Sequence, residues 1–250
     1  MPRVLDGNRF QYLHADRISP AVTYPRSREV AVERGFLGVH GEHTVNYLRH
    51  FQDSLLESDL LHHEQARSRR LADEAEAWLQ EICPGVNLET DEIQGTDLVR
   101  LGYRFGTAGL SSSDSYRPTN VGFGLTNVLP IIVACLIAKP GSLLMVENPE
   151  AHLHPRGQTA IARLTCATAA AGGQVILESH SDHILNGVRL AVKQQRLDAS
   201  MVVLHYFERV QHASGIKITS PEVGSDGLVS EWPDGFFDEW SNSLDELLDS

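Results

Sequence analysis

The sequence is poor in cysteine and lysine, and it lacks long apolar runs. It has 3 cysteines in 250 residues, too few and too scattered for a disulfide scaffold or a zinc knuckle. We therefore expect reduced thiols and a cytoplasmic protein. The longest apolar stretch, residues 128–138, is far shorter than the ~20 residues that span a bilayer. Residues 1–17 are polar and contain arginine, so we expect neither a secretory signal peptide nor a membrane contact.

Charge is distributed unevenly along the chain. The formal net charge of −12 at pH 7 argues against general binding to nucleic acid. Residues 218–250 contain nine acidic side chains and no lysine or arginine, whereas residues 1–35 contain six arginines and four acids. Nucleic acid is therefore a candidate partner for the arginine-rich N-terminal segment. The favoured interpretation of this segment is a solvated face of mixed charge.

Strands are predicted to alternate with helices from residue 125 onward, which is typical of a parallel α/β sheet. A buried helix is expected at residues 125–138, with Pro130 near its first turn, where a missing N–H costs least. A run of four apolar residues in the first strand, 143–147, fits a strand that is buried on both faces. The further expected elements are a strand at 174–178 and helices at 156–171 and 182–195.

The segment before this α/β part is predicted to be mixed. Residues 10–40 are irregular or strand-like, and apolar spacing indicates helices at 44–61 and 64–82. Alternating residues at 86–93 and 98–105 flank Gln94-Gly95-Thr96, which predicts a hairpin.

After the α/β part we expect a second strand pair and a tail. Residues 201–207 are predicted to pair with 216–219 across a turn at Ser214-Gly215, and the aromatic residues of the acidic tail are expected to dock on the core. The proposed divisions are a partial N-terminal segment with a helical and hairpin insertion, an α/β core, and an acidic aromatic tail: residues 1–110, 111–220 and 221–250.

Three polar clusters lie at the ends of buried elements. Residues 147–155 (Glu-Asn-Pro-Glu-Ala-His-Leu-His-Pro) end the first strand of the α/β part, and residues 178–183 (Glu-Ser-His-Ser-Asp-His) end the second. Open α/β sheets keep their active sites at the carboxyl ends of the strands. The third cluster, residues 120–124 (Asn-Val-Gly-Phe-Gly), begins the buried helix. A helix start suits an anion such as phosphate.

The three clusters, in this order, resemble the C-terminal part of an ABC-type ATPase. The resemblance is greatest to the SMC-, RecF- and OLD-like AAA proteins. Residues 231–238 (Glu-Trp-Pro-Asp-Gly-Phe-Phe-Asp) resemble the C-terminal signature of the DUF3696 branch, and residues 12–20 (Tyr-Leu-His-Ala-Asp-Arg-Ile-Ser-Pro) resemble a mid-chain segment of these proteins. The resemblance implies an α/β fold, with a partial P-loop NTPase sheet that is flanked by helices.

The resemblance implies catalytic roles for the residues that follow the two strands. Glu147 stands at the position of the Walker B acid, which orients Mg²⁺ through water. Asn148 stands where most ABC ATPases have the catalytic glutamate, and an amide orients water but does not accept a proton. Glu150 is a candidate for the missing base. His180 stands at the position of the switch histidine, which contacts the γ-phosphate of ATP.

The same resemblance implies contacts with a nucleotide that a partner holds. Asn120, Gly122 and Gly124 stand in the signature motif, which contacts the ATP of the opposite subunit. His152 and His154 stand in the D-loop, which crosses to the partner protomer. We therefore expect ATP and Mg²⁺ in a composite site that dimerisation forms.

One departure from the family is large. The sequence has no G-x-x-x-x-G-K-[ST] loop, the Walker A motif that cradles phosphate. Its three lysines, Lys139, Lys193 and Lys217, lie outside glycine-rich loops. We therefore expect the Walker A lobe to be missing and to be supplied by another chain. The expected partner is either a second copy, in a homodimer, or a chain that bears Walker A. DNA repair and anti-phage defence are the processes that the resemblance suggests. The alternative is a catalytically inactive fragment or a protein-interaction module.

Simpler interpretations exist for the same residues. Glu147 and Glu150 fit acids that cap the next helix, which is common at a strand–helix junction. A transition-metal cluster of Glu150 with four histidines is a weaker alternative than the nucleotide site. The histidines form two pairs about 26 residues apart: His152 and His154, then His180 and His183. Ser179, Asp182 and His183 are too close in sequence to act as a catalytic triad.

Overall fold

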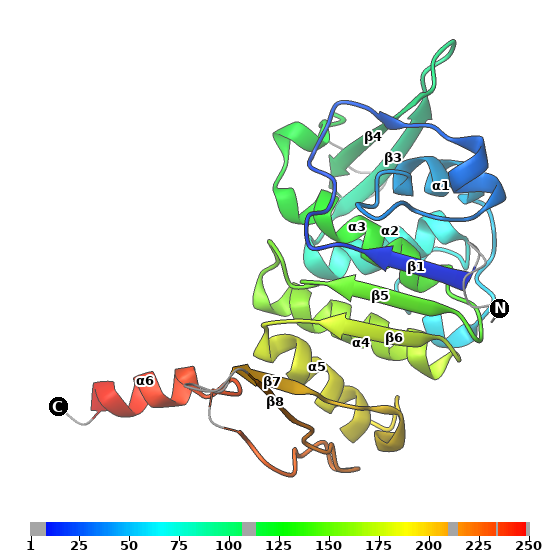
Figure 1. The fold of residues 1–250 in the computed structure, drawn as a ribbon. Helices are drawn as coiled ribbons and strands as arrows, with labels where there is room; N and C mark the ends of the chain where they lie inside the picture. Colours follow the sequence, from blue (N-terminus) through cyan, green and yellow to red (C-terminus); the bar gives the residue numbers. More distant parts are fainter. Residues whose placement is uncertain (1–8, 107–113, 210–214, 234, 249–250) are drawn as a thin grey trace.

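The centre of the molecule is a three-stranded parallel sheet. The computed structural model describes residues 9–106, 114–209, 215–233 and 235–248. The sheet order is β1-β5-β6, with β1 (Phe10–Leu13), β5 (Leu143–Glu147) and β6 (Gln174–Glu178). Figure 1 shows the three strands running in one direction. The predicted α/β fold with a parallel sheet is confirmed.

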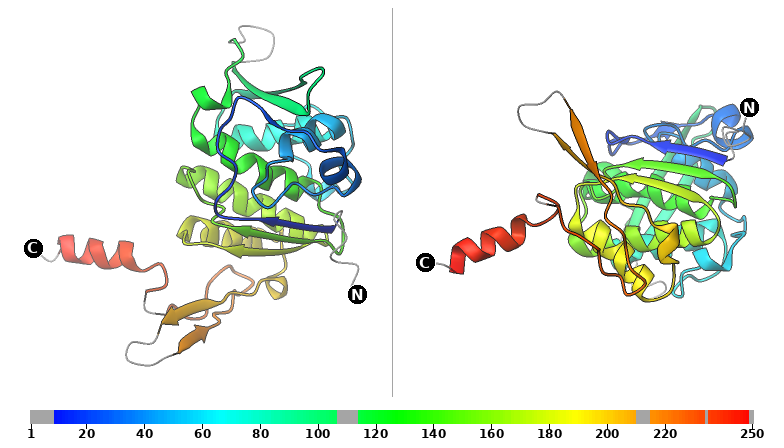
Figure 2. Two further views of the ribbon diagram at one scale, coloured as in Figure 1. Left: turned by 45° about the horizontal axis from the view of Figure 1, so that its top comes forward. Right: turned by 60° about the horizontal axis from the view of Figure 1, so that its bottom comes forward.

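Helices pack against one face of this sheet. α3 (Phe123–Leu136) contacts β1 and β5, and α4 (Pro155–Ala170) contacts β6. α2 (Leu71–Ile82) packs on both of them, and α5 (Asp182–Lys193) packs on α4. The views in Figure 2 show these helices gathered on one side of the strands.

The prediction that β5 is buried on both faces is wrong. Leu144 and Val146 are each 2% exposed, whereas Leu143 and Met145 between them are half-buried. Ile176 on the neighbouring strand β6 is 46% exposed. The alternation arises because the described helices cover only one face, so every second side chain of the sheet points away from them.

A second, antiparallel sheet extends the core. It contains β2 (Tyr24–Pro25), β4 (Leu98–Phe105) and β3 (Val86–Glu92) in the order β2-β4-β3. β3 and β4 form the predicted hairpin, with Val86 paired with Phe105. Gly95 has φ of 76° in the turn, a left-handed conformation that glycine adopts at little cost.

The two predicted N-terminal helices are shorter than expected. α1 covers Thr44–Phe51, and α2 begins only at Leu71. The residues between them form extended contacts instead, because the amide of Leu56 donates to the carbonyl of Arg69 and that of Leu71 donates to Ser54. The short helical segment η3 (Arg28–Glu33) was not predicted, and η4 (Asp59–Leu61) is a short helical turn at the end of the helix expected at 44–61.

α3 is the most buried helix of the core. It begins two residues earlier than predicted, so Pro130 is its eighth residue and lies inside the helix rather than near its first turn. Twelve consecutive residues from Leu125 to Leu136 are buried. Gly41, which has φ of 74°, packs closely against Pro130, because a Cβ there would lie 2.5 Å from the proline ring.

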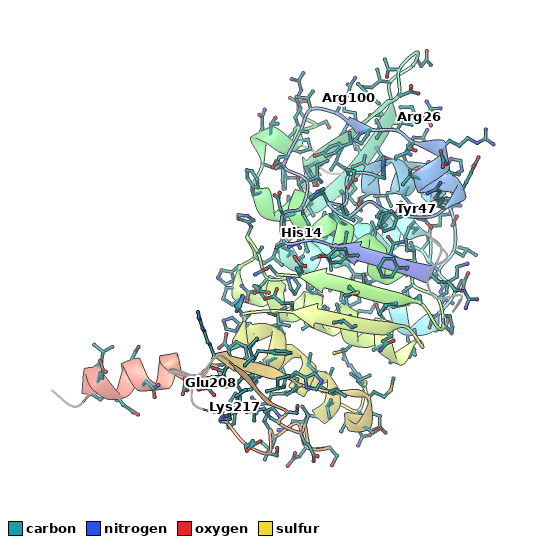
Figure 3. The ribbon with its side chains drawn as sticks, viewed as in Figure 1. His14, Arg26, Tyr47, Arg100, Glu208 and Lys217 are labelled. Atoms are coloured by element: carbon teal, nitrogen blue, oxygen red, sulfur yellow. The ribbon has the colours of Figure 1, made fainter. Side chains whose placement is uncertain are left out.

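The C-terminal part forms a separate ribbon and helix. β7 (Tyr206–Arg209) pairs with β8 (Ile216–Thr219), although β7 begins later than the predicted residue 201, where η6 (Ala199–Met201) ends. Glu208 and Lys217 pair across this ribbon (Figure 3). The tail docks through Phe236, which is 8% exposed and packs on Tyr206 and Trp232. The last element, α6 (Glu239–Leu248), projects from the body (Figure 1).

Parts of three predicted features lie outside the described residues. They are the boundary near residue 110, Ser214 of the turn at Ser214-Gly215, and Asp234 of the segment 231–238. Across the described part of the chain, every helix is too short or too polar to cross a membrane.

Candidate functional site

The carboxylate of Glu147 is held at the carboxyl end of β5 by β1 and the loop that follows it. The hydroxyl of Tyr12 donates to Oε1 at 2.5 Å, and the amide of Ala15 donates to Oε2 at 3.0 Å. Nε2 of His14 lies 3.6 Å from Oε2, and Figure 3 shows His14 beside the end of β1. The hydrogen bond from Tyr12, followed by that from Ala15, lowers the pKa of Glu147. Glu147 is therefore ionised at neutral pH.

Arg17 lies beneath this carboxylate and is 4% exposed. Its guanidinium donates to the backbone carbonyls of Glu147 and Asn148 at 2.6 and 2.7 Å. It also donates to Asn127 in α3. Burial lowers the pKa of Arg17 to about 10, while Glu150 and Glu147 oppose this shift. The residue therefore remains protonated at neutral pH.

Glu150 contacts the loop after β6, not the loop that holds Glu147. Its Oε2 accepts from the hydroxyl of Ser179 at 2.8 Å, and its Oε1 accepts from the amide of His180 at 2.8 Å. The ring of His180 is 79% exposed in its side chain and lies 3.0 Å from Oε1 of Glu178. Glu150 therefore fixes the backbone at His180 and leaves the ring accessible to solvent.

Asn148 connects the two groups of contacts. It has φ of 43°, in the left-handed region that asparagine tolerates better than most residues. Its amide donates to the carbonyl of Glu178 at 2.9 Å. The turn that follows β5 is therefore held by β6 on one side and by Arg17 on the other.

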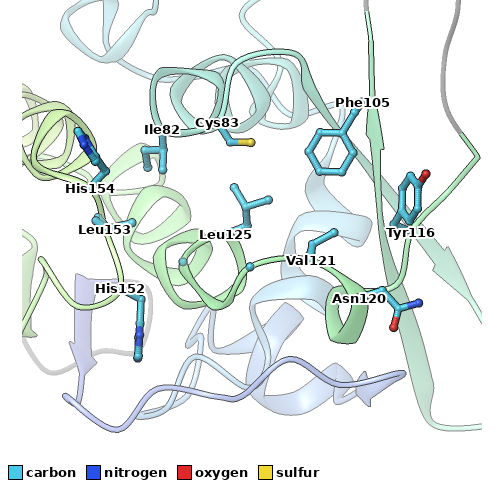
Figure 4. Close-up of a pocket in the computed structure, with 12 residues that line it drawn as sticks. Ile82, Cys83, Phe105, Tyr116, Asn120, Val121, Leu125, His152, Leu153 and His154 are labelled. Carbon is cyan, nitrogen blue, oxygen red and sulfur yellow. The ribbon is translucent and has the colours of Figure 1, made fainter.

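The glycines of the third cluster share a pocket with the two histidines after β5. Figure 4 shows this pocket, which has a volume of about 530 Å³. Asn120, Gly122, Gly124, His152 and His154 line it together with less polar side chains from several segments: Ile82, Cys83, Phe105, Tyr116, Val121, Leu125 and Leu153. A Cβ at Gly124 would lie 2.6 Å from the carbonyl oxygen of His152. Glycine is needed at position 124 for this close approach.

The structure separates the predicted site residues into these two groups. Glu147, Asn148, Glu150 and His180 surround the ends of β5 and β6. The other predicted residues lie around the start of α3, where the ring centres of Phe123 and His152 are 5.5 Å apart. Asn148 and His152, four residues apart on one turn, connect the groups.

Residues of the rival interpretations have other contacts. Ser179 binds Glu150, and Ser181 caps α5 by accepting from the amides of His183 and Ile184. Nε2 of His183 lies 3.7 Å from Oδ1 of its neighbour Asp182. Within the described residues, no three histidine, cysteine or acidic side chains are arranged to hold a metal ion.

The chemistry of these residues fits one side of a Mg²⁺–ATP site. Each oxygen of Glu147 accepts one protein hydrogen bond and keeps a lone pair for a metal-bound water. Gly122 precedes α3 as its N-cap, so the helix has no side-chain cap, and its first turn contains no acid. Such a helix start suits an anion. The sequence contains no Gly-Lys-Ser or Gly-Lys-Thr.

Sequence reasoning missed four residues of this site. Tyr12, His14 and Arg17 belong to the segment 12–20, which resembles a segment of these proteins, but the resemblance implies no role for any of the three. Asn127 lies within an apolar helix, and its isolated polarity in that buried run was the available signal.

Comparisons with known proteins match most of the chain. The family model described as "AAA domain, putative AbiEii toxin, Type IV TA system" matches residues 28–186. The model described as "Protein of unknown function (DUF3696)" matches residues 197–247. No curated protein matches the sequence.

Solved structures with similar folds are SMC ATPase heads. One, from work on ATP-driven dimerization and DNA-stimulated activation of SMC ATPases, is 12% identical with a TM-score of 0.45, covering 81% of this chain and 97% of that chain. The Pyrococcus furiosus Smc head bound to the C-terminal domain of ScpA is 11% identical with a TM-score of 0.42, covering 84% and 41%. The Pyrococcus yayanosii Smc head is 13% identical with a TM-score of 0.40, covering 60% of this chain and 26% of that chain. The chain spans less than half the length of both Pyrococcus proteins.

Proposed function

We propose that this chain, which belongs to the AAA domain family whose model matches residues 28–186, supplies one side of a composite site for ATP hydrolysis. The observation that carries the proposal is the position of Glu147. Its carboxylate is kept ionised by Tyr12 and Ala15 at the carboxyl end of a parallel strand. This edge of an open α/β sheet is where such folds bind ligands.

Glu147 would hold Mg²⁺ through water, and the bound ion would neutralise charge on the transferring phosphate. Asn148 would orient the attacking water, since its amide does not accept a proton. Glu150 is then the carboxylate that can accept the proton, and it also fixes the backbone of His180. The exposed ring of His180 is available to contact the terminal phosphate. His152 and His154, with the start of α3, would face a nucleotide held by the partner.

The partner would be another chain that bears a Walker A lobe, because this sequence has no Walker A motif for a second copy to supply. β6 pairs only with β5 among the described strands, so one of its edges remains open. The face that carries Ile176 is also uncovered, whereas parallel sheets are usually covered on both faces. A lobe that docks along the open side of β6 would bring its phosphate loop to Glu147 and His180.

The test is phosphate release from a complex reconstituted with a Walker A-bearing AAA polypeptide. We expect hydrolysis by the complex and its loss in Glu147→Gln. The control Glu92→Gln alters an acid that is 46% exposed in its side chain and pairs with Arg26, and it should leave the rate unchanged. Equal activity in wild type and Glu147→Gln would reject the proposed role of Glu147.

Titration of the isolated chain with Mg²⁺–ATP in a calorimeter provides a second test. Because the sequence contains no Walker A loop, we expect very weak binding. A micromolar dissociation constant would overturn the proposal that a partner supplies the phosphate cradle.

The second candidate is a nucleotide-independent interaction module. Asn148, at a position where a general base is expected, favours it. The two candidates differ in the reconstituted complex, because an interaction module would bind the partner without releasing phosphate.

The cellular process that we propose is anti-phage defence in the cytoplasm, with DNA repair as the alternative. The support is the family description, which names a putative toxin of a type IV toxin–antitoxin system. Plaque counts on cells with and without the gene test this proposal. Protection that survives Glu147→Gln would separate the defence role from ATP hydrolysis.

A further inference from the structure

We propose that Arg17 is a positioning residue that couples the start of α3 to the turn after β5. The inference rests on the proposed function, because it assumes that both segments belong to the ATP site. Arg17 is not one of the groups that would touch the nucleotide. It acts through the backbone and side chains that it binds.

The guanidinium of Arg17 joins three separate parts of the fold. Nη1 donates to the carbonyl of Glu147 at 2.6 Å and to that of His14 at 3.1 Å. Nη2 donates to the carbonyl of Asn148 at 2.7 Å. The end of β5 and the loop after β1 therefore share one donor group.

The third part is α3, reached through a single residue. Nε lies 3.0 Å from both the carbonyl and the Oδ1 oxygens of Asn127, and Nη2 lies 2.8 Å from Oδ1. Asn127 is 6% exposed and is the fifth residue of α3. It lies one turn after Phe123, so a shift of the helix start moves the atoms that Arg17 binds.

The guanidinium of arginine has five N–H donors in a planar fork. In Arg17 each of the five points to an acceptor. The acceptors are four backbone carbonyl groups and the side-chain oxygen of Asn127, and no carboxylate of the described residues is among its hydrogen-bonding partners. A buried cation that serves only to balance an acid would contact that acid directly. Arg17 instead arranges backbone, which is the expected geometry for a residue that sets positions.

The turn that Arg17 holds is conformationally strained. Asn148 has φ of 43°, and its carbonyl is held by Arg17 while its amide is held by the carbonyl of Glu178. Such a conformation persists only when its surroundings hold it. Loss of Arg17 would release the carbonyl side and let the segment between Glu147 and Glu150 change direction.

Lysine cannot replace this function, because its single ammonium lacks the planar fork. We expect Arg17→Lys to lower kcat of the reconstituted complex by about 10²-fold, the effect of misplacing a site by roughly 1 Å, with KM for ATP changed less than threefold. Asn127→Leu removes the same link from the α3 side and should give a similar loss. Asn127→Asp keeps both acceptor oxygens and should restore most of kcat.

The control is Arg26→Lys, because Arg26 pairs across the surface with Glu92, at 3.6 Å, and both side chains are partly exposed. We expect wild-type kcat and KM in this variant. If Arg17→Lys kept kcat within twofold of wild type in an active complex, the inference would be wrong.

Hydrogen–deuterium exchange of the isolated chain provides a readout that does not depend on activity. Arg17→Lys and Asn127→Leu should each speed exchange at residues 123–127 and also at residues 148–153, while the β3–β4 hairpin keeps its wild-type rates. Faster exchange in only one of the two segments, or uniformly along the chain, would contradict coupling. An inactive wild-type complex would reject the proposed function, and the exchange result would then decide the role of Arg17 alone.

Discussion

The hydroxyl of Tyr12 donates a hydrogen bond to Oε1 of Glu147 across 135 residues of sequence. The two side chains meet because β1 and β5 are neighbouring parallel strands, with Tyr12 opposite Met145 and Leu13 opposite Val146 in the register. The geometry of the acid therefore depends on correct pairing of the N-terminal strand. A shift of one residue in this pairing would place the tyrosine on the other face of the sheet.

Removal of this hydroxyl should raise the pKa of Glu147. The hydrogen bond from Tyr12 is the largest cause of the lowered value, so Tyr12→Phe should move it back toward that of an ordinary glutamate. An NMR titration of ¹³C-labelled glutamate side chains measures the change. A carboxylate whose pKa is lower in the folded protein than in the unfolded chain stabilises the fold at pH values above its unfolded pKa. This stabilisation is lost as the pH falls through the pKa of the folded protein. Tyr12→Phe should reduce the acid-dependent loss of stability.

Tyr47→Phe is the control for this titration. Tyr47 lies in α1, and its ring packs on Phe51 at 4.6 Å, a contact that phenylalanine keeps. The Glu147 titration should be unchanged in this variant. An unchanged Glu147 titration in Tyr12→Phe would show that the hydroxyl does not hold the carboxylate in solution.

Two glycines near the start of α3 should respond differently to the same substitution. A Cβ at Gly124 would lie 2.6 Å from the carbonyl oxygen of His152, whereas one at Gly122 meets nothing within 4 Å. Gly124→Ala should therefore cost about 1–3 kcal/mol of unfolding free energy, as for overpacking in a core. Gly122 has a negative φ of −61°, which alanine also adopts. Gly122→Ala should therefore change the free energy of unfolding by less than about 0.5 kcal/mol. Urea unfolding of the two variants compares them, and equal costs would argue against the close approach at His152.

Local patterns in the sequence predicted the elements that depend on neighbouring residues. The hairpin at β3 and β4 and the strands β5 and β6 were found because alternation and apolar runs are local signals. The helix expected at 44–61 stops at Phe51, because distant residues compete for its backbone: Leu56 pairs with Arg69. The helical spacing of apolar residues in 44–61 does not reveal that Leu56 bonds to Arg69, which lies 13 residues further along the chain.

The site was predictable to the same extent. Residues 147–155 and 178–183 identified the ends of β5 and β6, and the structure places them at one edge of the sheet. Arg17, by contrast, meets Asn127 and Glu147 across 110 and 130 residues. Its role arises from the tertiary arrangement, so its own sequence neighbours carry no signal of it beyond a family resemblance.

Thiol reactivity should follow burial. Cys135 is 0% exposed and Cys166 is 4% exposed, and burial raises the pKa of each thiol to about 12. Cys83 is only partly buried and lines the pocket in Figure 4. Since the thiolate is the reactive form, we expect dithiodipyridine to modify one thiol slowly in the native protein and all three in urea.

Cys83→Ser is the matched variant for this experiment. It should abolish the native reaction and leave two thiols that react after unfolding. Rapid native modification of a second thiol would mean that α3 or α4, which carry Cys135 and Cys166, opens more readily than their packing suggests.

Glu81 should stabilise the fold in a pH-dependent manner. It accepts from Arg163 at 3.1 Å and from Nε2 of His63 at 3.0 Å, and it joins α2 to α4. Partial burial raises the pKa of Glu81, but the hydrogen bonds from Arg163 and His63 outweigh it, so the net shift is downward. The stabilisation is therefore present above the unfolded pKa and is lost as pH falls through the lowered native value. Glu81→Gln should cost about 1–2 kcal/mol at pH 7, within the range for charged hydrogen bonds, and this cost should shrink below about pH 4.

The control for Glu81 is an acid in an exposed pair. Glu33 and Arg28 are 59% and 87% exposed in their side chains, and such pairs contribute about 0–1 kcal/mol. Glu33→Gln should therefore have little effect at either pH. Chemical unfolding at pH 7 and pH 4 gives all four differences. A cost for Glu81→Gln that stays constant between the two pH values would show that packing, not the ionised carboxylate, stabilises the contact between α2 and α4.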